Sequence, residues 1–351
     1  MRGQWRLHVL MGLAVAALAA CHAEVDDVSL VERKISIADK FYDIKATSPD
    51  RAIVVGYGGK ILLTENGGRS WEVIPSGTDR ALYNIQFADA ETGWISGQDG
   101  VMLHTADGGK TWQREFTGTA VYLFGISFVD KQRGWAVGDR ATMLETRDGG
   151  QNWSVRKLAQ SGSLNAEQAI TSQDPVLYGV QFVDAQNGWV VGEFGKIFHT
   201  SDGGATFKEQ QESLLGDGIF DVLDLPTFFG VHFQNANEGM AAGLDGKIAR
   251  TRDGGNTWRF EPMELEYPIV DPLFAAETIG NGSGIAVGAA GEVVRLDPGA
   301  SKWKRAKLGM EVLTWLRAVD FVTPDNGWIV GGFGLILHTQ DGGKTWLPSL
   351  G

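Results

Sequence analysis

The residues of this sequence that could do chemistry are, first, acidic side chains that recur inside one short phrase. The phrase reads Thr-x-Asp-Gly-Gly-x-Thr-Trp, and its third position holds Asn66, Asp107, Asp148, Asp202, Asp253, Asp297 and Asp341. A calcium loop of the EF-hand type needs several acidic ligands at alternating positions, whereas each phrase offers at most one carboxylate. Asp also accepts hydrogen bonds from turn N–H groups, and Gly-Gly supplies positive φ angles without steric cost. We therefore expect seven structural turns and no metal site.

The other groups with catalytic potential do not assemble into a known catalytic motif. His104, His199 and His338 occupy one position in three separate copies of the repeat, which argues against a shared metal. The sequence lacks a Gly-x-Ser-x-Gly elbow, a zinc motif and a phosphate-binding loop. Glycoside hydrolysis requires two carboxylates about 5 to 9.5 Å apart, or a tyrosine nucleophile. The sequence therefore predicts a protein that is not an enzyme and that binds no cofactor.

The phrases mark a repeat that organises the chain. Their central positions are 41 to 54 residues apart, which is the length of a propeller blade. Each unit reads as an alternating apolar strand, a Gly-Trp-x-Val-Gly strand, a two-residue hairpin, a strand ending in Thr, and a fourth strand after the Asp phrase. Seven such units around an axis bury the two apolar faces that a lone blade would expose. We expect an all-β fold, a seven-bladed β-propeller of four-stranded antiparallel blades over residues 40–351.

The N-terminus has the layout of an export signal. Residues 1–20 combine a basic start with an apolar stretch too short for an ordinary membrane span. The sequence Leu18-Ala19-Ala20-Cys21 resembles a bacterial lipobox, which predicts cleavage before Cys21 and a lipid on this cysteine, the only one in the chain. The alternative is an ordinary signal cut after Ala23. Residues 21–39 then form a tether, and residues 28–37 either add a strand to the last blade or serve as a linker.

The net charge and the predicted localisation restrict the classes of partner that we expect. The net charge is −12, which argues against nucleic acid because binding to phosphates uses clustered Lys and Arg. The signal predicts an exported protein on the periplasmic side of a bacterial membrane, held there by the lipid on Cys21. His22 follows the cysteine where an inner-membrane retention Asp would stand, which favours the outer membrane in a Gram-negative host. The expected partner is a membrane-protein complex at its extracytoplasmic face.

The repeated phrase resembles the Asp-box, or bacterial neuraminidase, repeats of sialidases, oligoxyloglucan hydrolases and sortilin-type receptors. Together with the Gly-Trp-x-Val-Gly strand, it most resembles the photosystem II stability and assembly factor family, over residues 40–350. This resemblance implies a seven-bladed propeller that holds newly made reaction-centre protein, and a lipoprotein form as in cyanobacteria. Related propellers occur in bacteria that do not photosynthesise, so the partner stays open. The alternative function is an exo-acting, sialidase-like glycoside hydrolase or a carbohydrate-binding propeller.

Two groups of residues are candidates for binding. If the Asp-box turns line one face of the ring, the opposite face carries the hairpin tips and the long inserts at 155–176 and 208–227, and variable loops on a regular scaffold are where binding usually occurs. The residues proposed for this rim are Tyr57, Arg80, Asp99, Arg140, Phe194, Arg317 and Phe333. An aromatic column on the innermost strands holds Tyr42, Tyr83, Phe124, Tyr178, Phe229 and Phe274, with Arg317 as the seventh member. The column predicts packing between blades, and Arg317 is either a functional cation or a solvated charge at the channel mouth.

Overall fold

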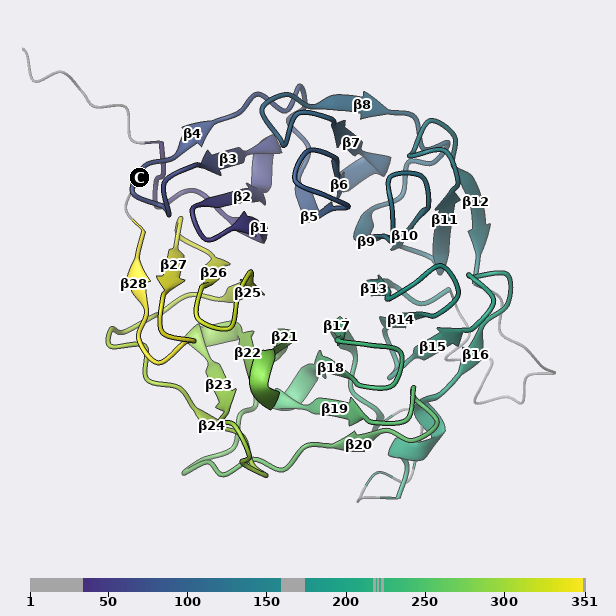
Figure 1. Ribbon diagram of the computed structural model, residues 1–351. Helices are drawn as coiled ribbons and strands as arrows, with labels where there is room; N and C mark the ends of the chain where they lie inside the picture. Colours follow the sequence, from purple (N-terminus) through teal and green to yellow (C-terminus); the bar gives the residue numbers. More distant parts are fainter. Residues whose placement is uncertain (1–33, 159–173, 217–218, 220, 222–223, 350–351) are drawn as a thin grey trace, which may run out of the picture. The chain divides into compact units, whose positions relative to one another are not determined.

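The computed structural model describes residues 34–158, 174–216, 219, 221 and 224–349. These residues form seven four-stranded antiparallel sheets arranged as a ring, which confirms the predicted seven-bladed β-propeller (Figure 1). The predicted signal peptide, Cys21 and most of the tether lie outside the described residues, as do parts of both inserts. Within the described part of the chain, no helix is long and apolar enough to cross a membrane.

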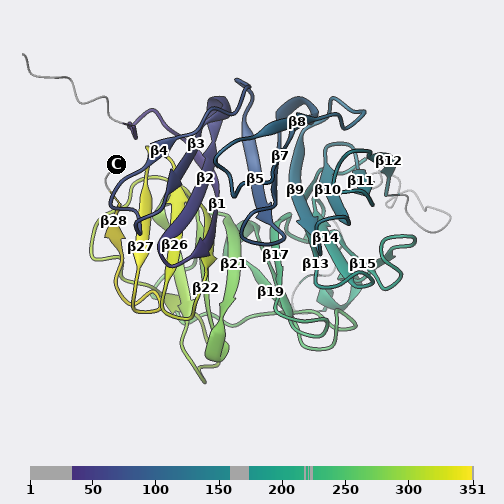
Figure 2. The ribbon, with the colours of Figure 1, turned by 45° about the horizontal axis from the view of Figure 1, so that its top comes forward.

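Each blade runs in sequence order from its innermost to its outermost strand. The innermost strands are β1 (Phe41–Ser48), β5 (Leu82–Phe87), β9 (Leu123–Phe128), β13 (Leu177–Phe182), β17 (Phe228–Phe233), β21 (Leu273–Ile279) and β25 (Leu316–Phe321). The second strands are β2 (Arg51–Gly56), β6 (Gly93–Gly97), β10 (Gly134–Gly138), β14 (Gly188–Gly192), β18 (Gly239–Gly243), β22 (Ser283–Gly288) and β26 (Gly327–Gly331). The innermost strands form the inside of the ring (Figure 2), and their side chains line a central channel.

The third and fourth strands form the outer part of each blade. The third strands are β3 (Ile61–Thr64), β7 (Met102–Thr105), β11 (Thr142–Thr146), β15 (Ile197–Thr200), β19 (Ile248–Thr251), β23 (Val293–Leu296) and β27 (Ile336–Thr339). The outermost are β4 (Glu72–Val73), β8 (Gln113–Glu115), β12 (Ser154–Lys157), β16 (Lys208–Glu209), β20 (Arg259–Phe260), β24 (Lys304–Arg305) and β28 (Leu347–Pro348). Short 3-10 turns are η1 (Tyr57–Gly59), η2 (Gln98–Gly100), η3 (Gln211–Leu214), η5 (Leu244–Gly246), η6 (Gly280–Gly282) and η7 (Ala289–Gly291).

The hydrophobic core lies between neighbouring blades. The described residues form seven apolar clusters, each shared by two adjacent blades. Every residue of strand β14, for example, is buried, because a second strand is covered by a blade on each side. The Trp189 ring lies between Phe233 of the next blade, 3.6 Å away centroid to centroid, and His199 of its own blade, at 4.7 Å. The histidine column therefore packs on tryptophan and does not form a joint site, and among described residues no cluster of acidic or histidine side chains could hold a metal.

The Asp phrase closes the turn from the third strand to the fourth. In the last blade, Asp341 Oδ1 accepts hydrogen bonds from the Lys344 and Thr345 backbone N–H groups at 3.0 and 2.9 Å. The Thr345 hydroxyl donates to Asp341 Oδ2 at 2.6 Å. The Thr339 hydroxyl donates to Asp341 Oδ1 and accepts from Gly343 N–H. These charge-assisted contacts hold the pKa of Asp341 at about 2 despite the opposing effect of its slight burial.

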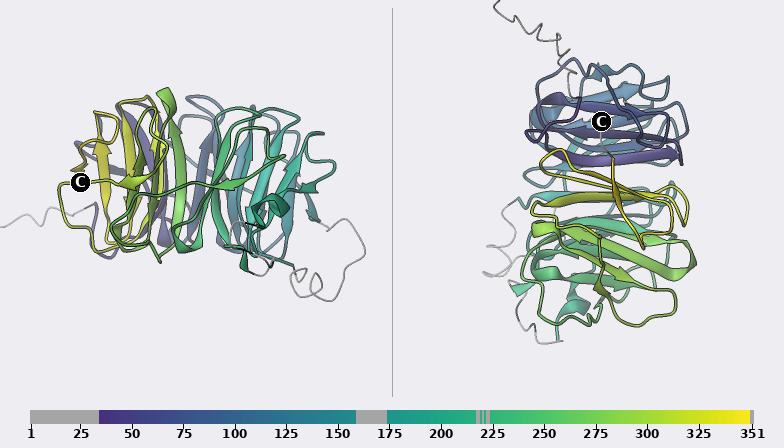
Figure 3. Two further views of the ribbon diagram at one scale, coloured as in Figure 1. Left: turned by 90° about the horizontal axis from the view of Figure 1, so that it is seen from below. Right: turned by 90° about the vertical axis from the view of Figure 1, so that its left-hand side faces the viewer.

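The hairpin tips between second and third strands are tied to the segments that link successive blades. In all seven blades the first tip residue donates its N–H to the carbonyl of the residue before the innermost strand, as from Asp139 to Tyr122 at 3.0 Å. A glycine precedes the tip each time, and a Cβ there would meet that same carbonyl oxygen, at 1.8 Å in the case of Gly138. Hairpin tips and links therefore share one face of the ring, which we call the link face. Because the strands of a blade are antiparallel, the Asp-box turns lie on the other face, and Figure 3 shows the ring from its side with loops at both faces.

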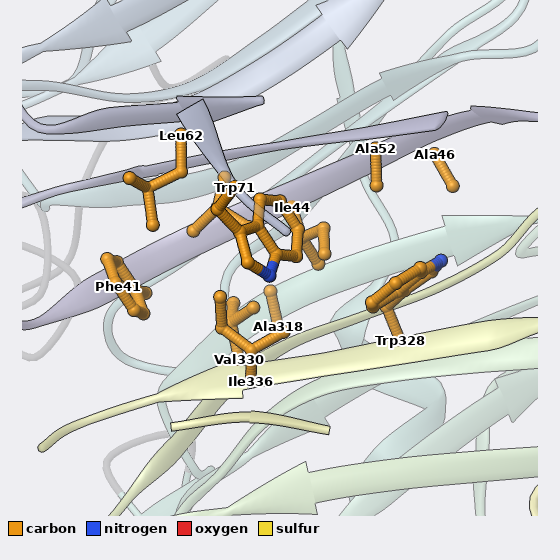
Figure 4. Packing of buried hydrophobic residues seen from close by; sticks show 11 residues of the cluster. Phe41, Ile44, Ala46, Ala52, Leu62, Trp71, Ala318, Trp328, Val330 and Ile336 are labelled. Carbon is orange, nitrogen blue, oxygen red and sulfur yellow. The ribbon is translucent and has the colours of Figure 1, made fainter. Parts of the chain in front are cut away.

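The ring closes between blades built from the two ends of the sequence. Strands β1 to β4 form one blade, and β25 to β28 form its neighbour without borrowing a strand. Residues 34–37 form no strand, and residues 28–33 lie outside the described residues. Trp71 and Trp328 pack edge to face across this joint, with centroids 5.8 Å apart (Figure 4). Trp71 also donates its indole N–H to Ser349 Oγ at 2.9 Å.

Candidate binding face and central channel

A β-bulge in every innermost strand aims one side chain into the channel. The register with the second strand skips one residue in each of the seven blades. The skipped residues are Tyr42, Tyr83, Phe124, Tyr178, Phe229, Phe274 and Arg317. Because a bulged residue has no ladder partner, the strand can turn its side chain away from the sheet. The aromatic column predicted from sequence is therefore a ring of side chains around the channel, which we call the collar.

The collar side chains touch one another around the axis. Successive aromatic centroids lie 5.0 to 5.5 Å apart from Tyr42 to Phe274, which is the usual range for favourable aromatic contacts. The Arg317 guanidinium lies over the Phe274 ring at 5.2 Å. Trp315, two residues before it in the chain, stacks on Tyr42 at 5.8 Å. The collar lies toward the link face, because each of its members comes directly after a link.

A second ring of polar side chains follows three residues later in each innermost strand. Its members, which we call the polar ring, are Lys45, Gln86, Ser127, Gln181, His232, Glu277 and Asp320. Five of them accept a hydrogen bond from the backbone N–H of the next blade's innermost strand, at 2.5 to 3.1 Å. The remaining two are basic. Asp320 thereby accepts from Ala46 N–H at 2.7 Å and also pairs with the Lys45 ammonium group, across the closing joint.

Burial in the channel shifts the pKa values of several side chains that line it. The channel has a volume of about 290 Å³. Desolvation raises the pKa of Asp43 to about 7, although the N–H groups of Ile85 and Ile44 oppose it. Burial and the nearby Asp320 carboxylate raise the pKa of Glu277 well above its ordinary value. Burial lowers the pKa of His232 to about 4, and Lys45 adds to this effect. Burial also lowers the pKa of Lys45, but neighbouring carboxylates more than offset it.

We expect Asp43 to make the fold less stable at alkaline than at acidic pH. Its folded pKa of about 7 is above the value of about 3.9 in an unfolded chain. Its contribution to stability is therefore complete below pH 4 and is lost as the pH rises through 7. As the pH is raised from 5 to 8, the free energy of unfolding of Asp43→Asn should increase by roughly 1–3 kcal/mol relative to that of the wild type. Urea unfolding of both proteins at these two pH values measures this difference, and parallel pH dependences would contradict it.

The structure separates the predicted rim residues into two places. Tyr57, Asp99, Arg140, Phe194 and Phe333 lie at hairpin tips of the link face. Arg80 lies on the neighbouring link and pairs with Asp99 at 2.7 Å, on the wall of a surface pocket. Arg317 instead belongs to the collar inside the channel. The polar ring was not among the predicted sites, although its members share a fixed offset of three residues from the aromatic column.

Four tip residues, two of them phenylalanines, have a backbone conformation that their side chains disfavour. The second tip position has a positive φ in every blade, and at this position Phe194 and Phe333 have φ of 56° and 57°. The other five blades place Gly58, Asp99, Arg140, Asp245 and Ala290 there. A left-handed conformation costs roughly 1–2 kcal/mol for an ordinary L-residue, and such strain is commonly retained for a binding role. Phe333 nevertheless exposes 61% of its surface.

Exposed apolar side chains concentrate on the link face. Among the described residues, twelve large hydrophobic side chains are exposed. Nine belong to tips, links or the segment before β1: Ile37, Tyr57, Phe116, Tyr122, Leu244, Tyr267, Val270, Leu313 and Phe333. The other three, Val73, Val155 and Leu347, lie in outermost strands. Apolar residues gathered on one face of a soluble protein indicate a contact surface.

Comparison with protein families finds one matching model. It describes the photosynthesis system II assembly factor YCF48 and matches residues 23–121, 116–173 and 262–349. No protein with a curated description matches the chain significantly.

Solved structures with the same fold include two described as YCF48. One, bound to a D1 peptide, is 21% identical, with 76% of this chain and 80% of that one covered and a TM-score of 0.58. YCF48 from Cyanidioschyzon merolae is 16% identical, with 86% and 96% covered and a TM-score of 0.66. A GH74 xyloglucanase from Xanthomonas campestris is 11% identical with a TM-score of 0.67, and the match covers 90% of this chain but 55% of the enzyme.

Proposed function

Because the chain belongs to the family of photosynthesis system II assembly factors of the YCF48 type, we propose that it is a non-catalytic binding protein that holds a membrane-protein partner during assembly. The partner surface is the link face. The exposed apolar side chains gathered there, together with strained Phe333 at a hairpin tip, support this most directly. The solved structure of YCF48 bound to a D1 peptide supports the proposal, because it is a similar propeller with a bound peptide.

The proposal includes export and attachment to a membrane. We propose that residues 1–20 are removed and that Cys21 carries a lipid, which places the propeller on the periplasmic side of a bacterial membrane. The support is the lipobox-like sequence that ends in the chain's single cysteine. An anchored link face would meet its partner at the extracytoplasmic side of the same membrane. Cys21→Ser should therefore move the protein to the soluble fraction, and unchanged membrane association would reject the anchor.

Capture of the partner should depend on the tips of the link face. We expect Tyr57→Ser combined with Phe333→Asn to reduce the recovered membrane protein about tenfold or more, equivalent to at least ~1.4 kcal/mol. Loss of two exposed aromatic anchors removes apolar contact area, and Asn tolerates the left-handed conformation at residue 333. The measurement is quantitative mass spectrometry after mild crosslinking of membranes that carry the full-length protein.

A matched control tests whether the effect belongs to this face. Val73 and Leu347 are also exposed and apolar, but they lie in outermost strands. Val73→Ser combined with Leu347→Ser should leave capture unchanged. Equal loss in both double variants, or recovery of no membrane protein from wild type, would count against the proposal.

Glycoside hydrolysis is the second candidate, and the channel gives one observation in its favour. Asp43 and Glu277 have raised pKa values, as a general acid requires. Both carboxyl groups, however, bind backbone N–H groups: Asp43 those of Ile44 and Ile85, Glu277 that of Phe321. We therefore assign them to ring packing. Turnover of fluorogenic xyloglucan or sialoside substrates that Glu277→Gln abolishes would establish the enzyme instead.

A further inference from the structure

Arg317 is a cation in the channel that forms no salt bridge with a described residue, although the Asp43 carboxyl is near enough to raise its pKa against the larger, opposite effect of burial. It replaces the aromatic residue that the other six blades place in the collar. No hydrogen bond or salt bridge joins its guanidinium group to any described residue, and its one contact of note is the face of Phe274. A guanidinium has five N–H donors in a planar fork. Leaving these donors unpaired in a half-buried position costs free energy, so Arg317 is better suited to a ligand than to packing.

Three tyrosines of the collar add hydrogen-bond donors to those of the Arg317 guanidinium. Tyr42, Tyr83 and Tyr178 line the same cavity, and no hydrogen bond joins their hydroxyl groups to a described residue. Desolvation raises the pKa of Tyr83 to about 12 and raises those of Tyr42 and Tyr178. At neutral pH these hydroxyl groups are therefore protonated and able to donate. Burial lowers the pKa of Arg317, but a guanidinium group stays charged in proteins at neutral pH.

The charged side chains of the cavity restrict the charge of a ligand that could bind at the collar. Asp43, Glu277 and Asp320 also line the cavity, and Lys45 supplies its other permanent cation. Lys45 is already paired with Asp320. These carboxyl groups disfavour a dianion such as phosphate more than a monoanion, whose single charge the Arg317 guanidinium can balance. The six aromatic rings favour an apolar body beside the charge, and the volume of about 290 Å³ is at the lower limit for small-molecule sites.

We propose that the collar is a binding site for a carboxylate carried on an apolar body, with the carboxylate on Arg317 and the body against the aromatic rings. The site is separate from the exposed tips of the link face and does not depend on the proposed assembly function. The same chemistry is offered by a free organic acid and by the carboxyl terminus of a peptide. Arg317 is the specificity-determining residue, because its guanidinium can hold a carboxylate with two parallel hydrogen bonds.

Calorimetric titration of the full-length protein tests the site with two pairs of probes. The first pair is 4-phenylbutanoate and 4-phenylbutanamide; the second is a short apolar peptide with a free or an amidated carboxyl terminus. We expect at least one charged member to bind about tenfold or more tightly than its amide, equivalent to ~1.4 kcal/mol. Preference in the first pair identifies a free acid, and preference in the second alone identifies a chain end.

Three variants test whether the preference for the charged probe depends on Arg317 in the collar. Arg317→Tyr installs the residue type found in other blades, so it should fold normally and lose the preference for the charged probe. Arg317→Lys should keep part of it, because the charge remains without the planar fork. Arg252→Met, in an Asp-box turn on the opposite face with its side chain 66% exposed, should leave it unchanged. Equal affinity for acids and amides in the wild type, retention of the preference in a folded Arg317→Tyr variant, or no binding of any probe up to about 10 mM would overturn the proposal.

Discussion

Gly138→Ala should destabilise the propeller by about 3 kcal/mol or more, although it adds a single methyl group. The new Cβ would lie 1.8 Å from the Tyr122 carbonyl oxygen. That oxygen belongs to the backbone and already accepts the Asp139 N–H, so it cannot move without breaking the contact between hairpin tip and link. Overpacking of well-packed sites commonly costs 1–3 kcal/mol, and loss of the buried hydrogen bond adds about 1 kcal/mol. Urea unfolding followed by tryptophan fluorescence measures the effect.

Gly77→Ala is the control for this prediction. A Cβ at Gly77 would have no neighbour within 4 Å, but the residue has a φ of 71°. Its cost should therefore be the conformational penalty alone, about 1 kcal/mol. If both alanine variants lose the same stability, the close carbonyl contact at Gly138 is not what requires glycine there.

Asp320→Ala should open the joint where the ring closes, at a cost of about 2–4 kcal/mol. The substitution removes the acceptor for Ala46 N–H and the partner of Lys45. Breaking a buried ion pair from one side typically costs 3–5 kcal/mol because a charge is left unpaired. The expected value is somewhat lower, since the Lys45 side chain is 34% exposed. Equilibrium unfolding measures the loss, and hydrogen exchange should show it first in β1 and β25.

The double variant Lys45→Met with Asp320→Leu separates two explanations of that loss. If the unpaired charge causes most of the destabilisation, replacing both partners by apolar residues should restore a large part of the stability. Ser127→Ala provides a milder comparison, because it removes a neutral acceptor from Phe182 N–H and should cost about 1 kcal/mol. An Asp320→Ala variant no less stable than Ser127→Ala would contradict the prediction.

The repeat made the fold predictable because both of its sequence signals have a direct physical cause. The Asp phrase satisfies a turn through contacts within eight residues, as Asp341 shows. The Gly-Trp-x-Val-Gly strand is buried on both faces, as in β14, so its composition follows from its place in a blade. Neither signal involves residues distant in sequence. Ring closure, in contrast, depends on contacts such as Trp71 with Ser349, whose partners lie at opposite ends of the chain and show no local pattern.

The candidate site in the channel was predictable only in part, because some of its properties also depend on residues that are distant in sequence. The aromatic column could be read from the alignment of the repeats, but the bulge that turns it into the channel appears only in the strand register. The polar ring follows the same repeat and could have been found at its fixed offset. Its chemistry could not, because the raised pKa of Glu277 depends on Asp320 in the next blade. The sequence places Arg317 in the aromatic column, but only the structure shows that its guanidinium lies over Phe274 without a hydrogen bond to any described residue.

The seven bulges also bear on how such a ring can acquire new specificities. A collar residue takes no part in the ladder between the first and second strands, so its replacement leaves the sheet register intact. One blade already carries Arg317 where six carry an aromatic ring. The collar is thus a set of seven interchangeable positions facing one volume, and a combinatorial library that varies only these codons should yield folded propellers with different ligand preferences.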